Sequence, residues 1–381
     1  MREAERGGFT EVAGMNHDTA ENCSVGTRGA CHARRLFMCA LLLPGMVSLP
    51  PAVHADPPPA LTGLQRDVTF TEPSPFSNNA EMAKRLLTPL YARRIRQELA
   101  RSGQALRDQP LDVARQHFAV YVPADRPAHG YALLVFVPPW ELATVPREWI
   151  PVLDRQGFIF VTAADSGNSA NIFDRREPLA LLAAHNIMQR YSVDPQRVYV
   201  GGFSGGARVA LRLALGYPDL FRGALLTGGT DPIGAADAPL PAADLLRQFQ
   251  NSSRLVYMTG AEDSLNLDKD IASRESLRDW CVFDLDTEAM PRAGHEAADA
   301  RSLESALKAL GNQEPVNATK LADCRARIER ELAAKLARLR EALSGGNTRE
   351  AAALLMKIDE RFGALAAPQS VEFAAQLESR H

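Results

Sequence analysis

The stretch that decides the fold reads Arg197-Val198-Tyr199-Val200-Gly201-Gly202-Phe203-Ser204-Gly205-Gly206. Its apolar first half predicts a buried strand, and a helix-like run over 207–215 follows directly. Between them stands G-x-S-x-G, where glycines two residues before and after the serine permit a sharp turn that a Cβ would obstruct. Such a turn projects Ser204 outward and aims the first N–H groups of the helix at an oxyanion, which is typical of a nucleophilic serine.

Apolar runs on both sides of this stretch predict alternating strands and helices. A continuous apolar run such as 131–137 is typical of a strand buried on both faces. A helix is predicted from about Pro178 to Tyr191, followed by a tight turn at 192–195. The predicted strands cover 118–123, 131–137, 157–161, 197–200, 223–227, 255–259 and 281–285. The pattern predicts an α/β fold with a mostly parallel sheet covered by helices on both faces.

A serine hydroxyl is a weak nucleophile at neutral pH, so Ser204 needs a base, and the base needs an orienting acid. In chains with this strand-turn-helix motif the acid and then the histidine follow the serine. Two histidines follow Ser204, namely His295 and the C-terminal His381. His295 comes after Gly294 in a loop that follows a predicted strand, so it is the candidate base. The alternative is a solvent-exposed loop histidine with no catalytic role.

The candidate acid is Asp263, which ends a G-x-x-D segment after the predicted strand 255–259. The carboxyl ends of the strands form the edge where active-site loops gather in open α/β sheets. Asp268 is the next choice, Glu262 is a neighbour that could substitute, and Asp231 is a weaker candidate.

An oxyanion formed during acyl transfer needs backbone N–H donors. One is expected from Gly205, directly after the serine, and another from the loop that follows strand 131–137. That loop begins Pro138-Pro139-Trp140, and because proline carries no N–H, Trp140 is its first available donor. Trp140 could also form a flat wall for an acyl group, or it could merely pack over the sheet edge.

A polar loop over 165–171 follows the predicted strand 157–161 and is expected to line the cleft. Asp165 and Asn168 are its candidate substrate-binding residues. Polar, amide-rich walls favour oxygenated substrates over long acyl chains. The cysteines have no metal-ligand spacing, so neither a metal site nor a cofactor is predicted.

Residues 191–206, the G-x-x-D at Asp263 and the pair Gly294-His295 together resemble the secreted polyhydroxybutyrate-depolymerase and feruloyl-esterase-like group of α/β-hydrolases. The resemblance covers about residues 111–312. It implies an α/β-hydrolase fold, a Ser-His-Asp triad at the positions named, and hydrolysis of carboxylic esters through an acyl-enzyme without a cofactor. Pro138-Pro139 departs from the His-Gly that this group usually has.

Three other functions stay open at this point. A serine peptidase of prolyl-oligopeptidase-like type would use the same triad, but the roughly 50 residues ahead of the core are too few for the propeller of that group. An acyltransferase would differ only in excluding water. A non-catalytic binding or scaffold protein could keep a hydrolase core and capture a partner through its C-terminal helices.

Four segments are predicted along the chain. They are a leader over 1–55, a segment over 56–110 with one helix at 79–102, a catalytic domain over 111–312, and a helical extension over 313–381. The extension is predicted as a hairpin of two helices, one over 318–343 and one that begins with a capping box at Asn347 and Glu350.

The leader has the pattern of a secretory signal peptide. Arg34-Arg35 precedes the apolar run 36–43, and Val53-His54-Ala55 follows as a cleavage site. The apolar run is too short to span a membrane, so export to the periplasm or the exterior is predicted. Cys281 and Cys324 remain after the leader, and in an exported protein they predict one disulfide.

The composition is that of an ordinary globular protein of 381 residues, 46% hydrophobic and 23% charged, with a net charge of −3. Positive charges are spread along the chain, and no basic run is interleaved with aromatic residues, which argues against nucleic acid as a partner. The expected partner is an ester substrate, small or polymeric, and the C-terminal helices offer a surface for a protein contact.

Overall fold

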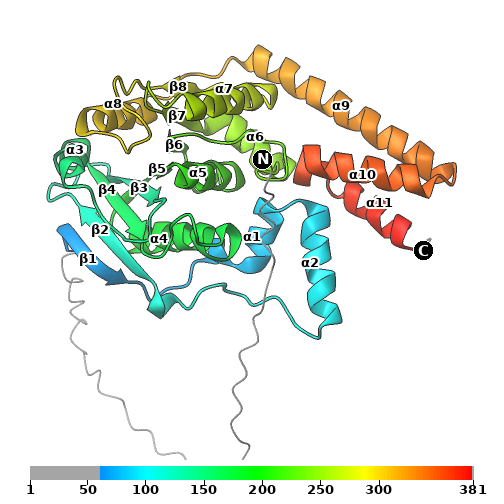
Figure 1. Cartoon of the computed structure of the whole chain (residues 1–381), viewed down its shortest axis with the longest axis horizontal. Helices are drawn as coiled ribbons and strands as arrows, with labels where there is room; N and C mark the ends of the chain where they lie inside the picture. The colour runs from blue at the N-terminus through cyan, green and yellow to red at the C-terminus, as the bar shows by residue number, and fades with distance from the viewer. Residues whose placement is uncertain (1–60, 380–381) are drawn as a thin grey trace, which may run out of the picture. The chain divides into compact units, whose positions relative to one another are not determined.

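The computed structural model describes residues 61–379, and their central feature is an eight-stranded sheet in the order β1-β2-β4-β3-β5-β6-β7-β8 (Figure 1). The strands are β1 (Gly63–Thr69), β2 (His117–Val122), β3 (Tyr131–Val137), β4 (Phe158–Ala163), β5 (Val193–Phe203), β6 (Gly223–Thr227), β7 (Arg254–Met258) and β8 (Leu285–Thr287). The β1–β2 and β2–β4 pairs are antiparallel, and all later pairs are parallel. The predicted mostly parallel α/β sheet is confirmed. The predicted leader over 1–55 lies outside the described residues.

Helices pack on both faces of the sheet, and α9, α10 and α11 lie beside it (Figure 1). The α-helices of residues 61–379 are α1 (Asn79–Leu86), α2 (Pro89–Arg101), α3 (Ile150–Gln156), α4 (Glu177–Arg190), α5 (Gly205–Gly216), α6 (Ala243–Ser252), α7 (Ser264–Asp279), α8 (Ala300–Gly311), α9 (Ala318–Ser344), α10 (Thr348–Phe362) and α11 (Gln369–Glu378). In β3, Leu133 and Val135 join the core cluster that contains α4 and α5, whereas Leu134 and Phe136 join the cluster with α3 and α8. Both faces are therefore buried, which explains why the strand is apolar throughout.

The strand before the serine starts earlier than predicted. The tight turn expected at 192–195 is instead part of β5, where Val193 pairs with Tyr131 and the register then shifts before Leu133 pairs with Val198. The backbone N–H of Gln196 donates to the Asp194 carboxylate at 2.9 Å. This local turn forms a bulge that leaves the chain paired on both sides, so it does not end the strand.

The segment ahead of the core differs from the prediction in two ways. The single helix expected over 79–102 is two helices, because Pro89 disfavours helical geometry at Thr88, whose side chain caps α2 by accepting from the Tyr91 N–H. Strand β1 was not predicted. A register shift between Gln65 and Val68 interrupts its two-residue alternation, which removes the sequence signal.

The strand predicted over 281–285 is also displaced, since β8 covers Leu285–Thr287. Residues 281 and 282 instead close the end of α7, where the N–H of Cys281 donates to Arg278 O and that of Val282 to Leu277 O. Cys281 has a positive φ of 65°, which is incompatible with a strand.

The C-terminal extension contains three helices rather than the predicted two, because α11 follows α10. Half of the predicted capping box is present, because the Glu350 N–H donates to Asn347 Oδ1. The Glu350 side chain accepts from Asn347 Nδ2 instead of the Asn347 backbone N–H, which donates to Ala342 O. The extension packs against α2 through α11. Arg93 of α2 forms an ion pair of 2.6 Å with Glu378 of α11.

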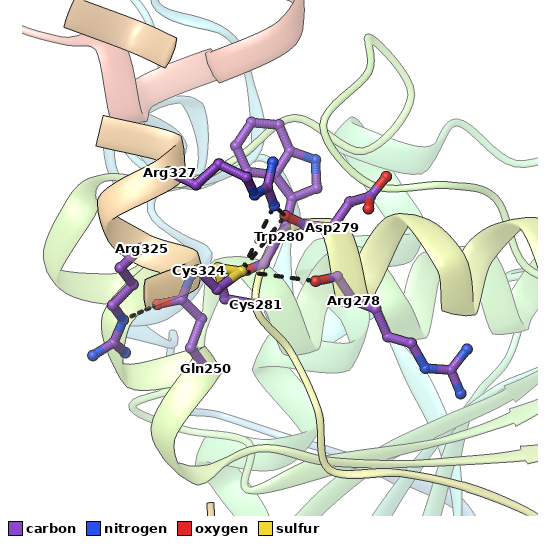
Figure 2. Close-up of a disulfide and its surroundings, with 8 residues drawn as sticks. All are labelled: Gln250, Arg278, Asp279, Trp280, Cys281, Cys324, Arg325 and Arg327. Carbon is purple, nitrogen blue, oxygen red and sulfur yellow. Dashed lines mark hydrogen bonds between the residues drawn. A yellow bond between two sulfur atoms is a disulfide. The ribbon is translucent and has the colours of Figure 1, made fainter. Parts of the chain in front are cut away.

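A disulfide joins the extension to the core. Figure 2 shows Cys324 of α9 bonded to Cys281, with Arg325 and Arg327 on either side. Arg325 Nε donates to Gln250 Oε1 of α6 at 2.6 Å, and Arg327 donates to the backbone carbonyl of Asp279. The predicted cysteine pair is thus bonded in the structure. No helix within 61–379 is long and apolar enough to cross a membrane.

Candidate active site

Ser204 lies on a strained turn between β5 and α5. Its backbone has φ 55° and ψ −124°, a conformation that costs energy for a residue with a side chain. A Cβ on Gly202 would overlap the backbone of Gly206, and a Cβ on Gly206 would overlap Val137 O at the end of β3. Gly202 therefore allows α5 to approach β5, and Gly206 allows it to approach the end of β3, which together leave room for the serine turn.

The structure brings Ser204, His295 and Asp263 into one hydrogen-bonded line. His295 Nε2 lies 3.0 Å from Ser204 Oγ, and His295 Nδ1 lies 2.6 Å from Asp263 Oδ2. Asp263 is the N-cap residue of α7 after β7, and His295 lies in the loop after β8. The two loops are joined by a hydrogen bond from the Glu262 N–H to Ala293 O.

Strand order and loop positions decide the fold family. The second strand runs antiparallel to its neighbours, the serine turn follows β5, the aspartate follows β7, and the histidine follows β8. This chain has the α/β-hydrolase fold. In that fold the Ser, Asp and His side chains meet above the carboxyl ends of the strands, although they are far apart in sequence.

Asn266 completes the arrangement and was not predicted from the sequence. Its Nδ2 donates to both carboxylate oxygens of Asp263 at 2.9 Å and lies 3.0 Å from His295 Nδ1. When His295 Nδ1 carries its proton toward Asp263, it cannot accept from Asn266, so the amide serves the carboxylate. Asn266 follows Asp263 by three residues, on the first turn of α7. This spacing is the only feature of the sequence that could have indicated its contact with Asp263.

Hydrogen bonding keeps Asp263 ionised. Burial raises the pKa of this carboxyl, but the hydrogen bonds from Asn266 and His295 lower it by more, so the pKa lies below its ordinary value of 3.8. An ionised Asp263 can hold the His295 Nδ1 proton and leave Nε2 free to accept from Ser204.

The other candidate acids do not approach the histidine. Asp268 and Glu262 are exposed to solvent, and within 61–379 neither forms a hydrogen bond or ion pair with His295. Asp231 lies 3.4 Å from Arg208 Nε on α5. Among the candidates, Asp263 alone contacts the ring.

The two candidate oxyanion donors have free N–H groups. Among the described residues, neither the Gly205 N–H nor the Trp140 N–H donates a hydrogen bond. Gly205 is the first residue of α5, where N–H groups lack intrahelical partners. The Trp140 ring is half-buried and lies 6.2 Å from the Phe203 ring, which in turn lies 4.8 Å from the His295 ring. Trp140 therefore also packs over the sheet edge.

The two candidate substrate-binding residues have different surroundings. The Asn168 side chain lies against Gly205, so that a Cβ there would overlap its amide. Asp165 is exposed, and its carboxylate lies 3.6 Å from Arg175. No hydrogen bond or ion pair in the described part of the chain joins Asp165 to Ser204 or His295. The structure thus brings Asn168 to the serine turn, and it shows no such contact for Asp165.

Glu141 ties the loop after β3 to the loop after β4. Its Oε2 accepts from the Gly167 N–H at 3.1 Å, and its Oε1 accepts from Ser169 Oγ at 2.5 Å. These bonds, led by the one from Ser169, hold the pKa of Glu141 below its ordinary value. Backbone bonds from Asp165 N to Glu141 O and from Asn168 N to Pro139 O reinforce the link.

Arg176 lies beneath the same two loops and is buried. Its Nε donates to Ser166 O and its Nη2 to Pro138 O, each at 2.9 Å. Burial lowers the pKa of the guanidinium to about 10, so it stays charged at neutral pH. Neither Glu141 nor Arg176 was predicted, because their roles depend on loops that meet only in the folded chain.

Residues 61–379 contain no group of three or more His, Cys, Asp or Glu side chains placed to hold a metal ion.

Comparison with known proteins gives partial similarities. No family model matches the chain. An acetylxylan esterase from Coprinopsis cinerea is 30% identical over 100 residues, which are 23% of this chain and 26% of the relative, so the match spans about a quarter of that protein.

Solved structures overlap with about half of the chain. A ferulic acid esterase matches with a TM-score of 0.39 and 19% identity over 51% of this chain and 90% of its own. An S-formylglutathione hydrolase from Agrobacterium tumefaciens gives 0.38 and 16% over 51% and 90%. A putative dipeptidyl aminopeptidase IV from Bacteroides ovatus gives 0.39 and 16% over 51% and 33%.

Proposed function

We propose that this protein is a serine esterase that hydrolyses carboxylic esters through an acyl-enzyme. The observation that carries the proposal is the hydrogen-bonded line from Ser204 Oγ through His295 to Asp263. A serine on a strained, outward turn with a base at 3.0 Å and an ionised acid behind the base has the parts that activate a hydroxyl nucleophile.

The reaction follows from this geometry. Ser204 Oγ attacks the ester carbonyl while His295 Nε2 takes its proton, and Asp263 stabilises the imidazolium that forms. The N–H groups of Gly205 and Trp140 donate to the tetrahedral oxyanion. His295 then protonates the leaving alcohol, and a water activated by the same ring hydrolyses the acyl-enzyme. The free acid leaves and Ser204 regains its proton.

Export belongs to the same proposal. The leader pattern over 1–55 and the bonded pair Cys281–Cys324 support a protein that works in an oxidising compartment. The name of the acetylxylan esterase relative supports an ester substrate.

Labelling with a fluorophosphonate probe tests the activated serine. We expect the wild-type protein to be labelled rapidly, and Ser204→Ala and His295→Ala to lose labelling by at least about a thousandfold in rate. Ser102→Ala and His129→Ala, which remove exposed side chains at the end of α2 and in the loop before β3, serve as matched controls and should label like wild type.

Turnover of paired model substrates then separates ester from amide hydrolysis. We expect the wild type to cleave a p-nitrophenyl acyl ester much faster than the matching anilide. A folded wild-type protein that the probe does not label would overturn the serine mechanism. Efficient anilide cleavage would instead identify a peptidase.

A further inference from the structure

The loop after β3 is poor in oxyanion donors. It begins Pro138-Pro139, and proline has no N–H, so Trp140 provides the first donor of this loop. Gly205 provides another at the start of α5. Pro138 and Pro139 leave the start of this loop without an N–H, so a side chain of a neighbouring loop is a candidate for a further donor.

The side chain of Asn168, on the neighbouring loop, lies against Gly205, the residue after the nucleophile. A Cβ built on Gly205 would stand 2.2 Å from Asn168 Oδ1, 2.9 Å from Cγ and 3.3 Å from Nδ2, so the amide lies against the residue after the nucleophile with its oxygen nearest. Asn168 is exposed, and its amide forms no hydrogen bond with the described residues. Rotation about its last torsion lets it present Nδ2 in either direction.

The backbone that carries Asn168 is fixed from several sides. The Asn168 N–H donates to Pro139 O at 3.0 Å, and Glu141 accepts from the residues on either side of it, Gly167 and Ser169. Arg176 holds Ser166 O and Pro138 O from below. Because this amide has no hydrogen-bond partner among the described residues and its backbone is held in place, little free energy is needed to reorganise it when negative charge develops beside it.

We infer that Asn168 Nδ2 is a third donor to the oxyanion, alongside the N–H groups of Gly205 and Trp140. The inference rests on the proposed ester hydrolysis and assigns Asn168 a catalytic role in it. When Ser204 Oγ bonds to the carbonyl carbon, the carbonyl π electrons move to the oxygen, and Nδ2 donates to that negative oxygen. When the carbonyl re-forms and the alcohol leaves, the hydrogen bond weakens again.

Steady-state kinetics of Asn168→Ala and Asn168→Asp on a p-nitrophenyl ester test this role. We expect kcat to fall by about a hundredfold to a thousandfold in Asn168→Ala, with KM within about threefold, because the donor acts on charge present only in the transition state. Asn168→Asp keeps the shape but offers only acceptors at neutral pH, so its kcat should be at least as low. Asn312→Ala, an exposed asparagine after α8, is the matched control.

The outcomes separate this role from the alternatives. A kcat within about threefold of wild type in Asn168→Ala overturns the inference, and so does a raised KM with unchanged kcat, which would make Asn168 a ground-state binding residue. The melting temperatures of both variants should stay near that of wild type. If Asn168→Ala does not fold, the kcat of Asn168→Asp decides whether Asn168 has this role. Wild-type protein without turnover or probe labelling refutes the proposed function itself.

Discussion

The carboxylate of Asp263 has two hydrogen-bond partners, the Asn266 amide and the His295 ring. Asn266 Nδ2 donates to both oxygens of Asp263, and both side chains are buried. Because the native pKa of Asp263 lies below 3.8, this carboxylate stabilises the fold above that pH. That contribution is lost as the pH falls through the native pKa.

Replacing this amide by a carboxylate changes the charge of the site with almost no change in shape. In Asn266→Asp, a second negative charge faces Asp263 and stabilises the protonated form of the His295 ring. We expect the acid limb of the kcat/KM profile to move to higher pH by about one unit. Asn266→Leu, which adds no charge, should lower kcat without that shift. An unchanged acid limb in Asn266→Asp would show that Asn266 does not act on the pair.

At the scale of the element, the first turn of α5 carries two glycines with different neighbours. A Cβ on Gly206 meets the backbone of Val137, which cannot move without displacing β3, whereas a Cβ on Gly205 meets only the end of the Asn168 side chain. Neither glycine has a positive φ. Gly206 is therefore required by the packing of α5 against β3, and Gly205 by the position of the Asn168 side chain.

These neighbours predict opposite outcomes for two alanine variants. Gly206→Ala should lower the free energy of unfolding by about 3 kcal/mol or more, because backbone overlap in a packed core is relieved only by shifting an element. Gly205→Ala should keep a melting temperature close to wild type but lose most of its turnover, since the methyl group displaces the Asn168 amide. Thermal unfolding combined with ester turnover measures both. Equal destabilisation of the two variants would contradict this distinction.

In the whole molecule, a disulfide joins the C-terminal helices to the rest of the chain at a distance from Ser204. The disulfide Cys281–Cys324 closes a separation of 43 residues and follows the far end of α7. A 16-residue helix spans about 24 Å, so the cystine and Asp263 lie at opposite ends of one rigid element. The extension therefore stabilises the fold without contributing a residue to the serine line.

Removal of this bond should reduce stability and spare the chemistry. For Cys324→Ser we expect a loss of about 2–4 kcal/mol in the free energy of unfolding, with probe labelling of Ser204 at 25 °C close to wild type.

The intact mass of the exported wild-type protein should be that of a chain that begins at Asp56, less the two hydrogens lost when the disulfide forms. A free-thiol count of two in that protein would contradict both the bond and the expected compartment.

Local sequence signals were sufficient to predict the strand-turn-helix at Ser204 and the mostly parallel sheet around it. Strand β3 and strand β6 occupy the predicted residues, because apolar runs bounded by turns are local signals that burial on both faces enforces. Glycine spacing around Ser204 is equally local. The order Ser, acid, His along the chain left several carboxylates open, and the position of Asp263 directly after a predicted strand made it the first choice. The structure brings Asp263 together with Ser204 and His295.

The side chains around these residues could not be predicted, because they come together through contacts between distant segments. Glu141 meets Gly167 across 26 positions, Asn266 meets His295 across 29, and Arg176 reaches Pro138 across 38. No periodicity links residues at such separations, since each contact depends on which loops meet at the sheet edge. For the same reason, neither β1, with its bulge, nor the helix α11 gave a clear local signal. Pairing with β2 at the edge of the sheet determines β1, and packing against α2 determines α11.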